Sequence, residues 1–534
     1  KRADVEIEHF LDEITSSLGV VPWRRAEDGF LKLKLDYIEQ LQKDLEQNNV
    51  KGKKTASYSH VLMFTGIFGG VQSLKLVVSV VRNKLASYLL GTTGYGLLAV
   101  YSSITEFVTN CCNCGIPINT TQKASELYED GTAEQMKDFA CTVRTWVVWT
   151  AVAAMLLSVV LSPVLSYFFF EHQWDHCLEV IMLTPMVIAF LVAEGECSLL
   201  KGMRKVRSVA TIESIVAVTT LLSTVPFYYW LGLRGIILAL VASTAISAFV
   251  HLWFSVRLVP YRISPFSMRI LREGWPFVRR GLPYVISGTA ASAAGMAVPM
   301  VILSTGNMDD VGLYRAAFAL MVGYAGMVFV ALEADYYPRL SSTHNHPERM
   351  NLCINQQIDV CVLLVTPLLI LLTLCLPLAI RLLYTGEFMS MTTMALCATF
   401  YTFFRAIMLP VAYTPLAKGK SIVYLCVELA YYAVFCLLVW LGWKFGGLAG
   451  VGIAYSVAAL YDLAVALIVY GRLYGCRLSA GTIRLSVVQF MLLAVNVVVC
   501  FQPLLWLRLS VGIPLFIVSS IYSFQLLRKR IKRG

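Results

Sequence analysis

Long apolar stretches separated by short polar segments dominate the chain from residue 61 onward. A membrane-spanning helix needs about 20 consecutive, mostly apolar residues, and fourteen stretches meet this requirement. They lie at 61–82, 95–118, 143–168, 178–200, 209–230, 235–257, 282–304, 312–335, 356–380, 391–416, 421–443, 447–470, 483–502 and 504–526. The pattern predicts an all-α polytopic membrane protein with about 14 transmembrane helices.

The first 54 residues differ from the rest because they mix acidic and basic side chains and contain no apolar run of spanning length. Hydrophobic residues near helical spacing predict two short helices there, at about 5–18 and 28–47. The segment is rich in acidic residues and lacks an apolar core, so it is not a signal peptide. We expect residues 1–54 to form a soluble cytosolic helical extension.

Composition agrees with a membrane protein and excludes other classes. Hydrophobic residues make up 57% of the chain and charged residues 14%, with a mean hydropathy of +0.68. Soluble domains carry about 25% charged residues, so a soluble enzyme, a disordered scaffold and a disulfide-rich secreted domain are excluded. The motif Cys111-Cys112-Asn113-Cys114 resembles a metal site, but no further Cys or His group completes four ligands. We therefore predict no metal at this motif.

The net charge of +11 is distributed unevenly over the predicted loops. If the N-terminus is cytosolic, most Lys and Arg residues fall in inner loops and in the basic C-terminal tail. The predicted outer loops then hold Arg82, Lys84, Arg234, Arg381, Lys444 and Arg508. Cytosolic loops of membrane proteins carry the excess of Lys and Arg. The bias predicts that both termini are cytosolic and that every outer loop is short.

Comparing the sequence with itself indicates an internal repeat of about 215 residues. Gly96 and Gly312 are 216 residues apart, and each begins a predicted helix; Glu213 and Glu428 are 215 apart. Six helices followed by six in the same orientation predict two lobes related by a pseudo-two-fold axis along the membrane normal, an arrangement that suits alternating access. The predicted segments are an N-lobe at 55–258, an amphipathic basic linker at 259–281, a C-lobe at 282–473, and two helices with a basic cytosolic tail at 474–534.

Short motifs at the helix ends carry a family resemblance. They are Arg82-Asn83-Lys84, Leu90-Gly91-Thr92-Thr93-Gly94-Tyr95-Gly96-Leu97, Leu200-Lys201-Gly202-Met203-Arg204-Lys205, Asp335-Tyr336-Tyr337-Pro338-Arg339-Leu340-Ser341 and Leu383-Tyr384-Thr385-Gly386-Glu387-Phe388. In these segments the chain resembles the Wzx-type O-antigen flippases of the multidrug/oligosaccharidyl-lipid/polysaccharide superfamily. The resemblance covers about residues 60–530, and the N-terminal extension lies outside the family pattern. Many Wzx-like proteins have twelve helices and the related lipid II flippases fourteen. The two additional helices predicted here therefore leave open which branch of the superfamily the chain resembles most.

Basic residues inside predicted spans are candidates for substrate binding. A charge at the bilayer centre costs about 2.5–3.5 kcal/mol on insertion scales, so such residues are functional candidates by default. Lys75, Arg315 and Arg405 lie within spans, although Arg315 is close enough to the outer end for its side chain to reach the interface. The resemblance implies that these cations share a central cavity that binds a lipid pyrophosphate. It also places Arg82 at the outer gate of that cavity.

Acidic residues inside the spans have two interpretations. They neutralise the buried cations, because an unpaired charge in a low dielectric is costly, or they bind H⁺ or Na⁺ to couple transport. The candidates for ion coupling or charge balance are Glu106, Glu213, Asp359, Glu428 and Asp462. Asp359 lies near the inner end of its span, where it is expected to be solvated. For Glu213 and Glu428 the repeat makes a structural role in each lobe an equal alternative.

These features predict a bacterial inner-membrane flippase that is not an enzyme and has no cofactor beyond a coupling ion, H⁺ or Na⁺. The resemblance implies a polyprenyl-pyrophosphate-linked oligosaccharide, an O-antigen or related repeat unit, as substrate. Membrane lipids and the glycan polymerase machinery are the expected partners, and nucleic acid is not. One alternative is a cation-coupled multidrug exporter of the same superfamily, although a cationic cavity opposes organic cations. Another is a membrane polysaccharide polymerase or ligase, which would need a larger outer loop.

Overall fold

The computed structural model describes the backbone of residues 29–170, 176–264, 268–324, 339–343, 346–502 and 504–531, with isolated residues between 325 and 338. Side chains are described from residue 70 onward, with gaps. The chain divides into two units, residues 1–69 and 70–534. In the first unit the predicted helix at 5–18 lies outside the described residues. The predicted helix at 28–47 is found from Gly29, and it continues without a break through residue 69.

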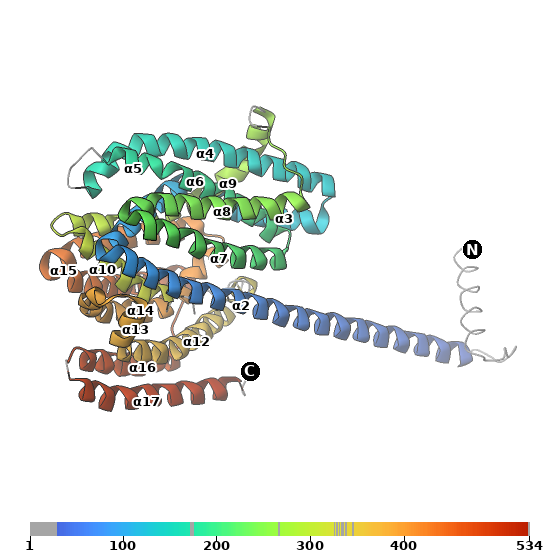
Figure 1. Ribbon diagram of the computed structural model, residues 1–534. Coiled ribbons are helices and arrows are strands. Elements are labelled where there is room, and N and C mark those ends of the chain that lie inside the picture. Colours follow the sequence, from blue (N-terminus) through green and yellow to red (C-terminus); the bar gives the residue numbers. More distant parts are fainter. Residues whose placement is uncertain are drawn as a thin grey trace. The chain divides into compact units, whose positions relative to one another are not determined.

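The described residues are almost entirely helical (Figure 1). The α-helices are α2 (Gly29–Cys112), α3 (Ile116–Asp130), α4 (Ala133–Phe169), α5 (Cys177–Met182), α6 (Thr184–Gly202), α7 (Val206–Leu231), α8 (Gly235–Leu258), α9 (Met268–Leu303), α10 (Met308–Phe318), α12 (Pro347–Leu374), α13 (Leu376–Leu383), α14 (Thr392–Ala417), α15 (Ser421–Tyr474), α16 (Ala480–Cys500) and α17 (Leu505–Ile531). Short elements join them: the 3₁₀ turns η1 (Gly232–Arg234) and η3 (Gly386–Met391), and the π-helical segment η2 (Ala319–Tyr324).

Nine helical stretches within the described residues are long and apolar enough to cross a membrane. Two of them, Arg207–Leu258 with 52 residues and Ser421–Tyr474 with 54, are long enough for two crossings each. Large apolar side chains such as Leu222, Phe249 and Val498 point outward and are more than half exposed. Exposed apolar surface of this kind requires lipid around it. The fold is therefore that of a multi-pass helical membrane protein, and the count of fourteen helices stays a prediction.

Two kinks replace loops that the hydrophobic pattern predicts. The segment 83–94 is helical within α2, and 444–446 is helical within α15. The chain turns at Gly91, with φ 67°, and at Gly447, with φ 52°. Positive φ costs a residue with a Cβ about 1 kcal/mol or more, whereas glycine adopts it freely. A single glycine thus redirects each helix without a polar loop.

Within residues 70–534 the helices form two groups in sequence order (Figure 1). Helices α3 to α8 pack on one another, with α6 against α3, α4 and α8 and with α7 against α8. Helices α10 to α17 form the second group, in which α15 packs along α14 and the pair α16–α17 packs on α12. Helix α9 contacts α3 and α4 as well as α15. Of the predicted linker 259–281, residues 268–281 form the first turns of α9.

The repeat-related glycines of α2 and α10 meet in a reciprocal contact. A Cβ added to Gly96 would overlap the carbonyl oxygen of Met308, and one added to Gly312 would overlap that of Thr92. Met308 follows Thr92 by 216 residues, and Gly312 follows Gly96 by the same number. Each turn therefore touches its counterpart through the same two positions, as a two-fold axis between them would require. We call this the reciprocal turn contact.

A buried ion pair holds the start of the segment after α8. Arg144 on α4 donates two hydrogen bonds to Glu196 on α6, Nε to Oε1 at 2.7 Å and Nη2 to Oε2 at 3.0 Å. The two side chains are 3% and 4% exposed. The same guanidinium donates to Ser255 Oγ at 3.1 Å and to the Pro260 carbonyl at 2.9 Å, and it lies over the ring of Tyr261. One cation thus joins two helices to the connecting segment.

Candidate functional site

A polar cavity of about 140 Å³ brings together two of the predicted cations, Arg82 and Arg315. It lies between the last turns of α2 before the Gly91 kink, the turns after that kink, α7, α8 and the last turn of α10. Its polar lining residues, apart from the two arginines, are Asn83, Tyr95, Ser102, Thr220, Thr224, Tyr228 and Ser243. Two guanidinium groups among hydroxyl and amide side chains form a site suited to an anion that carries several acceptor oxygens.

Local structure positions both arginines. Arg82 precedes Gly91 on α2, so the kink brings the turns on either side of it, with Asn83 and Tyr95, to the same cavity. Arg315 lies two turns into α10, whose start is fixed by a capping box in which Asn307 and Asp310 bond each other's backbone amides. A capping box removes two unsatisfied donors at a helix start and defines where the helix begins. Arg315 therefore enters the cavity from a well-defined turn.

Helix α2 contacts the second helix group beside this cavity. Lys84 donates to the carbonyl oxygens of Arg381 at 2.8 Å and Tyr384 at 2.5 Å. Thr92 and Thr93 donate to Asp309 Oδ1 at 2.7 and 2.6 Å. Tyr95, a cavity residue, packs edge-on against the Tyr384 and Phe388 rings. Together with the reciprocal turn contact, these interactions join α2 to α10, α13 and η3. We call this set the closed end.

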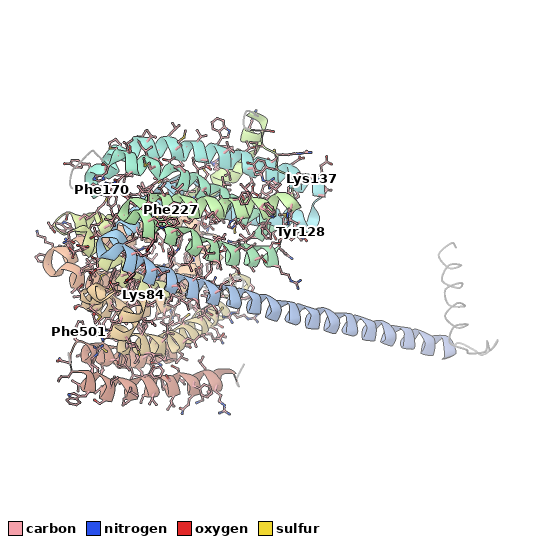
Figure 2. The ribbon with its side chains drawn as sticks, in the orientation of Figure 1. Lys84, Tyr128, Lys137, Phe170, Phe227 and Phe501 are labelled. Atoms are coloured by element: carbon pink, nitrogen blue, oxygen red, sulfur yellow. The ribbon has the colours of Figure 1, made fainter. Side chains whose placement is uncertain are left out.

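Figure 2 shows the two ends of the helical body through labelled residues. Tyr128 and Lys137, which flank the α3–α4 connection, lie at one end, and Lys84, Phe170 and Phe501 lie toward the other. The sequence predicts the first pair on the inner side and the other three at or near the outer side. The closed end contains Lys84 and thus belongs to the predicted outer side.

Lys75 does not line the cavity with Arg82 and Arg315. Its Nζ lies 2.5 Å from Glu213 Oε2 on α7, with the two side chains 38% and 27% exposed. The positive charge within this predicted span is thus matched by a carboxylate from a neighbouring helix.

Arg405 also lies apart from the cavity, in a cluster on α14 and α15. Its Nη1 donates to Asp462 Oδ2 at 3.4 Å. Glu428 lies near enough to interact electrostatically with both Arg405 and Asp462, and also with Tyr424 and Tyr432. Asp462 and Glu428 are buried, at 2% and 4% exposed. Two buried carboxylates thus lie beside one guanidinium, which does not line the cavity of Arg82 and Arg315.

The remaining acidic candidates divide by burial. Asp359 on α12 is 2% exposed, so the expectation that it is solvated is wrong; neighbouring helices cover the inner part of its span. Glu106 on α2 is exposed. Glu213 on α7 is close to Lys75 on α2, and Glu428 on α15 is close to Arg405 on α14. This shared pairing of a glutamate with a cation is compatible with equivalent positions of Glu213 and Glu428 in the two repeats.

Sequence reasoning missed Arg144, which begins a predicted span and resembles an ordinary inner-loop cation. Its partner Glu196 is 52 residues away, a separation with no local signal. It also passed over His251, which lies near Cys197 and Glu213. A histidine within an apolar run was the available signal, since such residues are rare in membrane spans.

Comparisons with known proteins show the family and support the fold. The family model described as polysaccharide biosynthesis protein matches residues 86–393, more than half of the chain. Among solved structures, the lipid II flippase MurJ in an inward closed conformation superposes with a TM-score of 0.64 at 14% identity, over 86% of this chain and 99% of that one. A search of the curated proteins finds no significant match to this sequence.

Two further structures share the fold. An inward-facing multidrug resistance transporter of the MATE family matches with a TM-score of 0.57 at 12% identity, over 75% of this chain and 98% of that one. A superfamily transporter from Pyrococcus furiosus, described by the reverse polarity of its binding pocket, matches with a TM-score of 0.53 at 11% identity, over 82% of this chain and 95% of that one. The chain thus belongs to the polysaccharide biosynthesis protein family, and it shares its fold with the lipid II flippase and with the multidrug resistance transporter.

Proposed function

We propose that this protein moves a polyprenyl-pyrophosphate-linked oligosaccharide, an O-antigen or related repeat unit, across the bacterial inner membrane. The observation that carries the proposal is the shared cavity of Arg82 and Arg315. Arginine engages phosphate oxygens through two parallel N–H donors, and the surrounding hydroxyl groups supply further donors. The cavity volume of about 140 Å³ is sufficient for a phosphate group; the glycan and the lipid need the wider space of other conformations.

The closed end supports a sequence of steps for transport. In the state described here α2 and α10 are joined at the predicted outer side, so the substrate enters from the inner side. The pyrophosphate binds Arg82 and Arg315 while the polyprenyl chain stays in the bilayer. Separation of the reciprocal turn contact then opens the cavity outward. Because transport breaks no covalent bond, the protein needs only to alternate between two packed arrangements.

The ion pairs favour charge balance for two of the acidic candidates. Glu213 contacts Lys75 and Asp462 contacts Arg405, and each carboxylate offsets a cation that would otherwise be costly in the membrane. Glu428 adds a second carboxylate beside Arg405. Two buried carboxylates, Glu428 and Asp462, thus accompany one arginine. This cluster is a better candidate for coupling to H⁺ or Na⁺ than the Lys75–Glu213 pair, in which the charges balance.

A multidrug exporter is the alternative within the superfamily. Organic cations prefer cavities lined by acidic and aromatic groups, whereas the cavity described here presents two guanidinium groups and no carboxylate. The Pyrococcus furiosus relative is described as having a pocket of reverse polarity that suggests a different function. By the same logic, the polarity of the Arg82–Arg315 cavity favours an anionic substrate here.

Replacing Arg315 with glutamine is expected to abolish complementation of a flippase-null strain at unchanged membrane abundance. Loss of one hydrogen-bonded charge lowers the binding free energy by about 1.5–3 kcal/mol, which is roughly a ten- to a hundredfold loss of affinity for the pyrophosphate. Arg315→Lys should restore surface glycan display only in part, because the positive charge is kept while the two parallel N–H donors of the guanidinium are lost. The measurement is surface glycan display against protein level.

Arg234→Gln is the matched control, because this arginine is exposed on η1 at the same predicted side and lies outside the cavity. Its display should equal that of the wild type. Arg82→Gln should behave as Arg315→Gln does. Normal display from either cavity variant at equal abundance would remove the pyrophosphate site from the proposal.

We also propose that the protein lies in the inner membrane with both termini in the cytosol. Cysteines introduced one at a time into a cysteine-free background should then report sidedness. Positions 204–207 and 528–531 should react with an impermeant maleimide only from the cytosolic side, and positions 306–310 only from outside. Labelling of the C-terminal positions from outside would contradict both the orientation and the even number of spans.

A further inference from the structure

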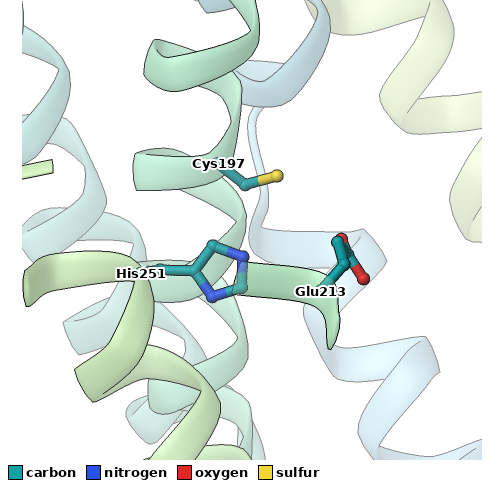
Figure 3. Close-up of side chains that lie close together, drawn as sticks. All are labelled: Cys197, Glu213 and His251. Carbon is teal, nitrogen blue, oxygen red and sulfur yellow. The ribbon is translucent and has the colours of Figure 1, made fainter. Parts of the chain in front are cut away.

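Three potential metal ligands converge on the inner half of the first helix group. Cys197 on α6, Glu213 on α7 and His251 on α8 place their ligand atoms within 4.8 Å of one another (Figure 3). Cys197 and His251 are buried, and Glu213 is partly exposed. Sulfur, imidazole nitrogen and carboxylate oxygen are the three ligand types that zinc takes in proteins. The three side chains come from different helices, so tertiary packing brings them together.

The histidine already has the orientation of a metal ligand. Its Nδ1 lies 2.8 Å from the carbonyl oxygen of Ser247, one turn back on α8. A carbonyl can only accept, so Nδ1 carries the proton in the neutral ring and Nε2 keeps its lone pair. Metal-bound histidines typically donate the other ring N–H to a carbonyl or carboxylate in this way, which fixes the tautomer and the ring. The Ser247 contact therefore leaves Nε2 as the ligand atom.

We propose that Cys197, Glu213 and His251 bind a zinc-type divalent transition-metal ion, with a fourth position open to water. Bond lengths of about 2.0–2.3 Å place neighbouring tetrahedral ligands about 3.5 Å apart. The ligand atoms of the three side chains lie within 4.8 Å of one another, so these distances need to shorten by little more than 1 Å, which side-chain rotation can achieve. The site binds a soft or borderline ion and is distinct from the Arg82–Arg315 cavity, so it does not rest on the proposed transport substrate.

Lys75 is the group that a metal at this site has to displace. Lys75 holds Glu213 at 2.5 Å, so a divalent ion competes with the ammonium group for the same carboxylate. Metal and Lys75 are therefore alternative partners of Glu213.

The position of the cluster gives the ion a route of entry. Cys197 lies about one turn before the end of α6, Glu213 two turns after the start of α7, and His251 two turns before the end of α8. All three ends are predicted to face the cytosol, and the Lys75 and Glu213 side chains are 38% and 27% exposed. An ion from the cytosol would tie α6, α7 and α8 together and release Lys75 from its partner.

Cobalt binding to the full-length protein in nanodiscs tests the proposal, because Co²⁺ replaces zinc and its thiolate bond gives a charge-transfer band. After chelation and buffer exchange, we expect one equivalent of Co²⁺ to bind with this band and Zn²⁺ to displace it. Cys197→Ser should remove the band, and His251→Ala or Glu213→Gln should weaken binding at least about tenfold. Lys75→Met should strengthen binding about tenfold, because the competing cation is gone.

The control is the triple variant Cys111→Ser/Cys112→Ser/Cys114→Ser, which removes the thiol cluster near the end of α2. This variant should keep the band, whereas loss of the band there and its survival in Cys197→Ser would overturn the proposal. Unchanged or weaker binding in Lys75→Met would also overturn it, because metal and lysine would then not share Glu213. Co²⁺ titration and Zn²⁺ displacement are measured without transport, so failure here leaves the pyrophosphate test unaffected.

Discussion

Replacing Arg144 with methionine is expected to destabilise the protein by about 3–5 kcal/mol, the cost of leaving a buried carboxylate without its cation. The side chain of Glu196 is 4% exposed, so water cannot replace the two lost hydrogen bonds. The contacts to Ser255 and Pro260 are lost as well, which frees the segment after α8. The measurement is thermal unfolding of the purified protein in detergent, monitored as the loss of monodisperse protein with rising temperature.

The double variant Arg144→Met/Glu196→Leu should recover much of this loss, because no charge is then left buried. Lys123→Met is the control: it removes an exposed pair with Glu126, in which both side chains are at least half exposed. Such pairs are worth about 0–1 kcal/mol. Equal unfolding temperatures for Arg144→Met and Lys123→Met would show that the buried pair does not stabilise the fold.

Replacing Gly96 with valine should shift the protein away from the conformation in which the closed end is formed. The added side chain would overlap the Met308 backbone carbonyl, which cannot move as a flexible side chain can. Overpacking of this kind costs about 1–3 kcal/mol, equivalent to roughly a 5- to 150-fold change in a two-state population. A cysteine at cavity position Ser102 should therefore react faster with an impermeant maleimide applied from outside.

Gly312→Val should give the same result, because the turn contact is reciprocal. Gly295→Val is the matched control: this glycine is also helical, on α9, and a Cβ there would have no neighbour within 4 Å. All variants belong in a cysteine-free background. If Gly96→Val and Gly295→Val gave equal labelling rates, the reciprocal turn contact would not hold the outer side closed.

The sequence predicts the helical membrane fold well because a spanning helix is a local property of about 20 residues. It predicts the kinks less well. The residues from Asn83 to Gly94 look polar enough for a loop, but their polar groups have partners in the fold. Lys84 donates to the carbonyl oxygen of Arg381 on α13, and Thr92 donates to Asp309. Tertiary contacts thus allow a helix to continue where its composition alone favours a loop.

The candidate site is only partly readable from the sequence, for the same reason. Intramembrane charge singles out Lys75, Arg315 and Arg405, yet it does not say which side chains share a cavity. The structure places Arg82 with Arg315, and it gives Lys75 and Arg405 carboxylate partners 138 and 57 residues away. Helix rotation and lobe packing decide these pairings, and neither leaves a local pattern in the chain.

The hydrogen bond between Thr93 and Asp309 bears on how such a chain arises by duplication. The two residues are 216 apart, the same offset that relates the turns of the reciprocal contact, so each is the repeat partner of the other. A dimer of identical six-helix subunits would bring two copies of one residue together at this point, either two aspartates that repel or two threonines without a charged acceptor. A single chain with two different halves can place a donor in one half and an acceptor in the other. At this position it makes a hydrogen bond that two identical halves could not make.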